Sequence, residues 1–71
     1  MKYEVGIAAM YRILKKAGAE RVSEESAAEL RRVVEGAAGA IAGDAVRLAS
    51  HAGRKTVRAE DVRMASESRR S

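Results

Sequence analysis

The chain has 71 residues, with 14 Lys and Arg against 10 Asp and Glu, a net charge of +4, and neither Cys nor Pro. This length leaves no room for a multidomain enzyme, and a chain without Cys has no disulfide, no thiol nucleophile and no Cys-ligated metal. No apolar run approaches the roughly 20 residues of a membrane span, and residues 1–6 lack the apolar core of a signal peptide. We therefore expect a soluble, intracellular, single-domain protein.

The first predicted helix runs from about Gly6 to Ala17. Its apolar residues fall at helical spacing, with basic residues largely on the other side. A loop follows over residues 17–23. Gly18 lies just past the apolar segment, where the residue after a helix favours a positive φ.

The second predicted helix is long and begins after Ser23, a natural N-cap. Glu24 and Glu25 suit the positive end of its dipole. Its apolar stripe has nearly heptad spacing and consists of Ala27, Leu30, Val34, Ala37, Ile41, Ala45, Leu48 and Ala52. About 28 residues make a rod of about 42 Å. It ends before a second loop over residues 51–57, which contains Gly53.

The core available to this rod is thin. The chain has 15 Ala, and its Leu, Ile, Val and Met residues number only 16. Small cores usually need a metal, a disulfide or a partner, so we expect oligomerisation. Residues 36–43 include three Gly inside the helix, at a cost of roughly 2–3 kcal/mol. Either this is tolerated drift in the sequence, or two long helices cross there with their backbones close together.

The third predicted helix begins near Arg58 or Ala59, and Glu60 and Asp61 complement its N-terminus. The tail from Ser66 onward is expected to fray. The chain thus reads as an all-α domain over residues 1–71, with a core of about 6–67 and frayed residues 68–71. Its order is short helix, long helix, short helix.

Positive charge gathers on the first helix, the second loop and the tail, with a net +3 over residues 1–18 and again over residues 53–71. Such a distribution suits a polyanion, because each neutralised phosphate releases condensed counterions. A merely solvated basic face is the alternative. The two aromatic residues, Tyr3 and Tyr11, are too few for recognition by base stacking.

Two segments resemble archaeal histones. The segment 17–23 reads AGAERVS and resembles the first loop of that family. The segment 48–62 reads LASHAGRKTVRAEDV and resembles the end of the long helix, the second loop and the start of the last helix. The resemblance covers about residues 10–65, and the predicted helix order is that of the histone fold. The chain departs from the family in its small residues at 36–40, in a tail without the usual apolar residue and in an N-terminus without prolines.

The resemblance implies an obligate, intertwined head-to-tail homodimer, the handshake dimer, in which the long helices cross near their middles. It implies that the first loop of one protomer lies beside the second loop of the other and that double-stranded DNA wraps around them. In that arrangement Arg12, Lys55 and Thr56 would contact phosphates and Arg21 would enter the minor groove. Charge and position make Lys15, Lys16 and Arg58 plausible additional contacts.

The resemblance also assigns roles away from DNA. Arg54 pairs with Asp61 and braces the second loop. Leu48, His51 and Asp61 lie at an interface where dimers join into tetramers or longer assemblies. Gly18 lets neighbouring turns stack closely. We expect no cofactor, no metal and no catalysis, because His51 has no partner at catalytic or metal-ligand spacing.

The sequence therefore predicts an archaeal histone that binds, wraps and compacts DNA without sequence specificity, associated with the nucleoid in the cytoplasm. Its partners would be DNA and a second copy of itself or a paralogous histone, with no membrane and no small-molecule substrate. One alternative is a histone-fold protein that forms a heterodimer in a transcription complex. Another is a basic amphipathic binder of anionic membranes.

Overall fold

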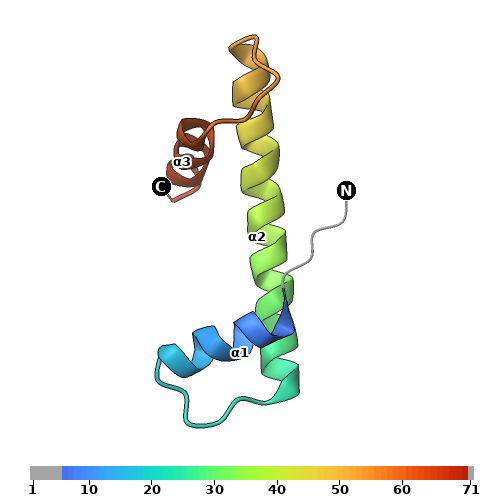
Figure 1. Ribbon diagram of the computed structural model, residues 1–71, viewed down its shortest axis with the longest axis vertical. Coiled ribbons are helices and arrows are strands. Elements are labelled where there is room, and N and C mark those ends of the chain that lie inside the picture. Colours follow the sequence, from blue (N-terminus) through green and yellow to red (C-terminus); the bar gives the residue numbers. More distant parts are fainter. Residues whose placement is uncertain (1–5, 71) are drawn as a thin grey trace. The chain divides into compact units, whose positions relative to one another are not determined.

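The computed structural model describes residues 6–70, which form three helices and, within that range, no strand. Helix α1 covers Ile7–Lys16, α2 covers Glu24–His51 and α3 covers Ala59–Ser68 (Figure 1). The predicted all-α class and helix order are confirmed. The expectations about residues 1–5 and about Ser71 concern parts of the chain outside the described residues.

The long helix begins at the predicted cap. The Ser23 hydroxyl accepts a hydrogen bond from the Ser26 N–H at 3.0 Å, and the Ser26 hydroxyl donates to the Ser23 carbonyl at 2.8 Å. Two of the first turn's polar groups are thereby satisfied. Glu24 and Glu25 follow in the first turn, where their charge complements the helix dipole.

Helices α1 and α2 end in the same backbone arrangement. Each is followed by a glycine with positive φ, 114° at Gly18 and 73° at Gly53. The N–H of the residue after each glycine donates to a carbonyl five residues earlier, at 3.1 Å to Leu14 and at 2.9 Å to Ala49. This is the Schellman motif, whose positive φ strains any residue with a Cβ. Both predicted helix stops are confirmed.

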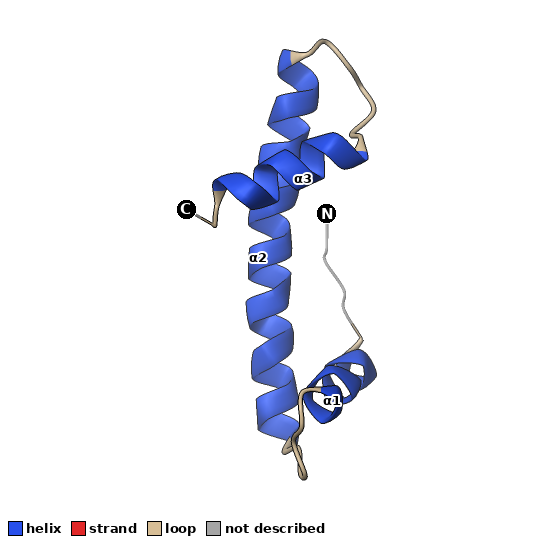
Figure 2. Ribbon diagram, turned by 90° about the vertical axis from the view of Figure 1, so that its left-hand side faces the viewer, coloured by secondary structure: helices blue, strands red, loops and turns tan. Residues whose placement is uncertain are grey.

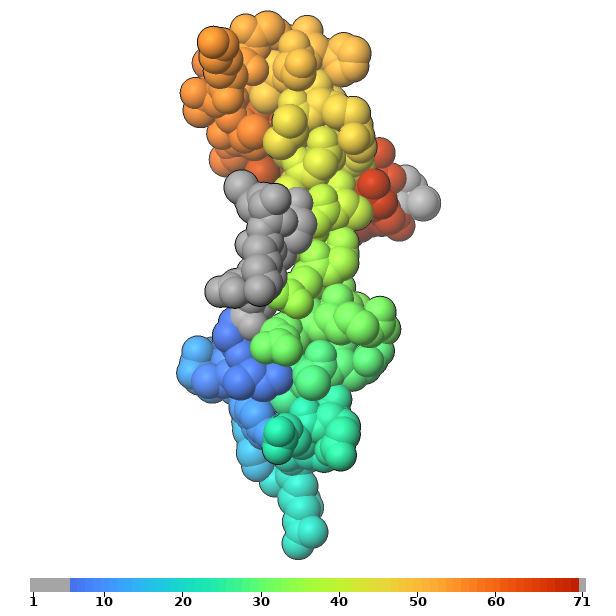
Figure 3. Space-filling model, turned by 90° about the vertical axis from the view of Figure 1, so that its right-hand side faces the viewer, coloured from blue at the N-terminus to red at the C-terminus, as the bar shows by residue number. Residues whose placement is uncertain are grey.

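The chain packs as two units, residues 1–37 and residues 38–71. In the first unit α1 lies against the N-terminal half of α2, shown as blue against green in Figure 3, and Met10 and Ala27 are buried. In the second unit α3 crosses the C-terminal half of α2 (Figure 2), and Ala45, Ala49 and Ala65 are buried. Each unit thus has a small core of its own.

These cores contain little apolar volume. Within residues 6–70, Met10 is the one large side chain that is fully buried, and the other buried apolar residues are all alanines. Six large apolar side chains remain 40–58 % exposed: Ile13, Val33, Val46, Val57, Val62 and Met64. Fully burying a side chain of this size contributes about 1.5–3 kcal/mol. The chain therefore leaves much of its apolar surface for something else to cover.

The last helix is longer than its sequence suggested. We expected fraying from Ser66, but α3 continues to Ser68 and Arg69 caps it. The reason is a tertiary contact, because Arg69 Nε donates to Asp44 Oδ2 on α2 at 2.7 Å. Asp44 also pairs with Arg47, and the Arg69 hydrogen bond is the main cause that lowers the pKa of Asp44 below its ordinary value. The predicted boundary at residue 67 thus lies one residue short of the helix end.

Candidate functional site

The first unit presents four basic side chains on α1 and on the loop that follows it. Arg12, Lys15, Lys16 and Arg21 are all exposed. Arg12 and Lys16 are four residues apart on α1, so they lie on the same side of that helix. Arg21 stands in the irregular segment between α1 and α2. All four can meet an anion at the surface.

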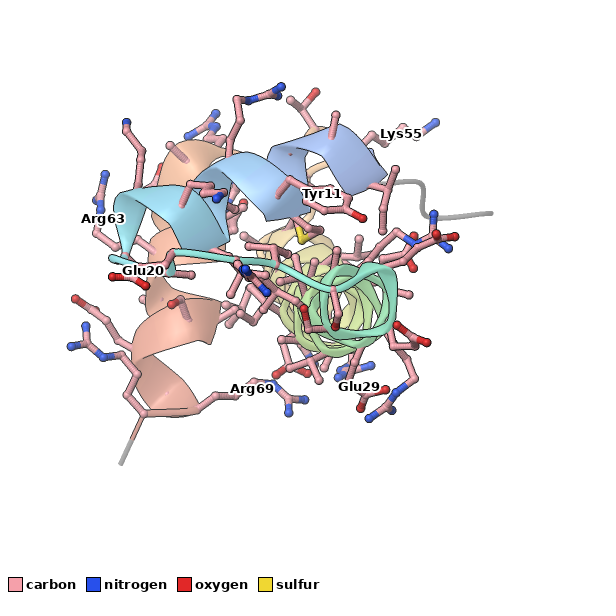
Figure 4. The ribbon with its side chains drawn as sticks, turned by 90° about the horizontal axis from the view of Figure 1, so that it is seen from below. Tyr11, Glu20, Glu29, Lys55, Arg63 and Arg69 are labelled. Atoms are coloured by element: carbon pink, nitrogen blue, oxygen red, sulfur yellow. The ribbon has the colours of Figure 1, made fainter. Side chains whose placement is uncertain are left out.

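Lys15 is already engaged within its own unit. Its ammonium Nζ donates a hydrogen bond to the backbone carbonyl of Glu20 at 2.6 Å. Figure 4 shows Glu20 on the segment that leads from the end of α1 to the start of α2. The bond therefore ties the last turn of α1 to the loop immediately before Arg21.

The second loop is held from inside by Arg54. Its guanidinium forms a bidentate pair with the carboxylate of Asp61, with both N···O distances at 2.9 Å. Nη1 also donates to the Thr56 carbonyl at 3.1 Å, and Asp61 accepts a further bond from the Arg58 N–H at 2.8 Å. Asp61 is buried, with 5 % of its surface exposed. The loop and the first turn of α3 are thus locked together by two charged groups.

The same contacts shift the acidity of Asp61. The hydrogen bond from Arg54, followed by that from the Arg58 N–H, lowers the pKa of Asp61 from 3.8 to about 2. Hydrogen bonds to the charged form of a carboxyl group favour that form. Asp61 therefore stays ionised throughout the ordinary pH range, as its bracing contacts require.

We expect Asp61→Asn to remove part of the acid sensitivity of folding. The folded protein binds fewer protons than the unfolded chain while the pH lies between the two pKa values of Asp61, 3.8 and about 2. The stabilisation is complete above that window and is lost as the pH falls through it. Denaturant melts of both proteins across the window measure the effect. The same loss in both proteins, or an ordinary pKa in a carbon NMR titration of wild-type Asp61, would contradict this expectation.

Outside this brace, the second loop presents groups that can reach a ligand. Lys55 and Thr56 are exposed, and Figure 4 shows Lys55 extending away from the helices. Arg58 is also exposed and lies 3.6 Å from Glu60. An exposed ion pair of that kind contributes little, typically below about 1 kcal/mol, so the Arg58 guanidinium can exchange partners at small cost.

A shallow groove of about 340 Å³ runs between α2 and α3 within the second unit. Its lining consists of Asp44, Arg47, Leu48, His51, Met64, Ala65 and Ser68. Two predicted interface residues, Leu48 and His51, thus meet at one surface beside the exposed Met64. Asp61, the third, is not part of this lining and makes its contacts with Arg54 and Arg58 instead.

Sequence reasoning missed two contacts. The bond between Lys15 and Glu20 joins a side chain to a main-chain carbonyl, and no residue pattern reports such a bond. The pair between Asp44 and Arg69 spans 25 positions. The spacing of Asp44 and Arg47, i and i+3 on a helix, was the only available sign that Asp44 is a charged contact.

Within residues 6–70, no group of three or more His, Asp and Glu side chains could hold a metal ion. None of the described helices combines the length and the apolar character needed to cross a bilayer.

Comparison with known proteins gives matches over most of the chain. Residues 3–65 match the family described as histone-like transcription factor (CBF/NF-Y) and archaeal histone. The chain is 52% identical over 62 residues to a subunit of the archaeal histone HAN1 of Thermococcus zilligii. It is 50% identical over 62 residues to probable archaeal histone 3 of Methanocaldococcus jannaschii. Each alignment covers 87% of this chain and 92% of the relative. The family match includes α1, both loops, all of α2 and most of α3.

Proposed function

Since the chain belongs to the family of histone-like transcription factors and archaeal histones, we propose that it is a chromatin protein that binds double-stranded DNA. It wraps and compacts DNA without reading its sequence. The observation that carries this proposal is that the two loops of a histone-family chain present Arg21, Lys55 and Thr56 at the surface. Cations that neutralise phosphates release counterions, and backbone contacts of this kind carry no sequence code.

The binding unit is a homodimer in the handshake arrangement. Its support is the exposed apolar surface of the single chain, where Val33 and Val46 on α2 are 50 % and 55 % exposed. A Cβ at Gly36 would meet no atom within 4 Å, so this chain by itself does not require a glycine there. A partner helix that crosses close to the backbone at this point supplies the missing reason for a small residue.

In the dimer, the first loop of one protomer and the second loop of its partner form one DNA-binding surface. Arg12, Lys55 and Thr56 contact phosphates, and Arg21 enters the minor groove. Lys15, Lys16 and Arg58 add positive charge along the same track. Arg54 has a different role, because its guanidinium is occupied by Asp61 and the Thr56 carbonyl and orients the loop. Gly18 allows successive turns of wrapped DNA and protein to approach closely.

Digestion of reconstituted complexes with micrococcal nuclease tests the proposal. We expect the purified chain to form dimers in solution and to protect mixed-sequence DNA in fragments of regularly increasing length. Naked DNA and a complex assembled in high salt serve as controls, because electrostatic binding is screened. A compact, cooperatively melting monomer, or digestion patterns equal to those of naked DNA, would overturn the proposal.

Dimers join through the groove that Leu48 and His51 line on the second unit. We expect His51→Ala to spare the dimer and its affinity for short DNA but to shorten the series of protected fragments, because the larger assemblies lose a contact. Sedimentation of the DNA-free variant checks that the dimer persists. A series of wild-type length from this variant would contradict the assignment of His51 and Leu48 to the interface; Asp61, engaged with Arg54, would then act as a brace alone.

A second function remains open, because the matched family also contains transcription factors and one relative is named as part of a histone with more than one kind of chain. In that case the chain pairs with a paralogous histone-fold protein rather than with itself. A purified chain that stays unfolded alone and folds when a paralogue is added would favour this alternative. We otherwise place the protein on the chromosome in the cytoplasm, with no cofactor, no small-molecule substrate and no reaction to catalyse.

A further inference from the structure

The bond between Lys15 and Glu20 links two parts of the first unit that the helix-ending motif leaves separate. The Schellman motif of α1 reaches as far as Ala19, whose N–H donates to the Leu14 carbonyl at 3.1 Å. Residues 20–22 beyond it have no regular secondary structure. The Lys15 ammonium extends the hold of α1 one residue further, to the Glu20 carbonyl at 2.6 Å.

That carbonyl belongs to the peptide group that also contains the Arg21 N–H. A peptide group is planar, so fixing the direction of its C=O also fixes the direction of the bond that leads into Arg21. Arg21 itself is exposed. An exposed, rotamer-rich side chain on an irregular segment gains direction only from its backbone, and Lys15 supplies that restraint.

We propose that Lys15 is a positioning residue for Arg21 rather than an independent phosphate contact. This inference rests on the proposed function and refines it, because it separates two neighbouring ammonium groups by role. Lys16 is exposed on the same turn and contributes charge to the DNA track, whereas Lys15 orients the loop from which Arg21 reaches the DNA.

A double-mutant cycle in the full chain tests this role. Lys15→Met should weaken the binding of mixed-sequence DNA roughly fivefold when Arg21 is present and by less than about twofold in the Arg21→Ala background, because only residues that act together couple in this way. Lys16→Met is the matched control, with the same charge removed and the same loss expected in both backgrounds. Equal losses for Lys15→Met in the two backgrounds would overturn the inference.

A measurement without DNA separates this inference from the proposed function. In the DNA-free protein, Lys15→Met should speed amide hydrogen exchange at residues 20–22, and Lys16→Met should leave it unchanged. Unchanged exchange in Lys15→Met would show that the bond does not restrain the loop and would overturn the inference alone. Failure of the wild-type chain to bind DNA would instead overturn the proposed function, and the positioning role with it.

Discussion

Replacing Arg21 and Lys55 together by alanine is expected to cause the largest loss of DNA binding that two substitutions can produce in this chain. Each belongs to a different loop, and both side chains are exposed. In the proposed dimer they lie on one surface. The slope of the logarithm of the affinity against the logarithm of the salt concentration should become shallower by up to about 0.9 for each lost phosphate contact. Titrations at several salt concentrations measure both the affinity and the slope.

The chain offers a matched control for this variant. Arg31 and Arg32 are exposed on α2, and their joint replacement by alanine removes the same charge. They lie outside the proposed surface, and Arg32 pairs with Glu29, whose pKa it lowers. We expect a nearly unchanged slope for this control. Equal losses from the two double variants would show that binding depends on net charge and would contradict the assignment of the loops.

Replacing Met10 by alanine is expected to reduce the free energy of unfolding by about 2–5 kcal/mol, the usual cost of truncating a large buried side chain. Met10 is 1 % exposed. The alanines around the core are too small to fill the resulting cavity. Denaturant melts at a fixed chain concentration measure the loss, because the stability of a dimer depends on that concentration.

Met64→Ala is the control for this second prediction. It makes the same chemical change at a side chain that is 58 % exposed, and surface substitutions usually shift stability by no more than about 0.5 kcal/mol. A comparable loss from both variants would mean that Met64 is buried in the dimer. A negligible loss from Met10→Ala would mean that the core of the first unit lies elsewhere.

The helix boundaries were predictable because their signals are local. Ser23 caps α2 through a bond to a residue three positions away, and Gly18 and Gly53 stop their helices through bonds that span at most five residues. Interactions over so short a span can be inferred from residue types and spacing alone. The same holds for the loop motifs, whose order and separation predicted the family before any coordinates were considered.

Which residues the fold buries could not be inferred so easily. An apolar stripe of nearly heptad spacing on the long helix contains both Ala27, which is fully buried, and Ala37, which is exposed. Periodicity places residues on one face of a helix, but packing decides which of them another helix covers. In the single chain α1 and α3 cover only parts of that face.

Composition, spacing and short-range hydrogen bonding thus determined the helices, their ends and the family of this protein. The tertiary structure alone decided that Arg69 secures the end of α3 on Asp44 and that Lys15 holds the loop before Arg21. It also decided that Asp61 is buried while Lys55 and Thr56 remain exposed. The physical reason is that these contacts depend on where separate elements of the chain meet, and that meeting is set by packing rather than by any local preference of the residues involved.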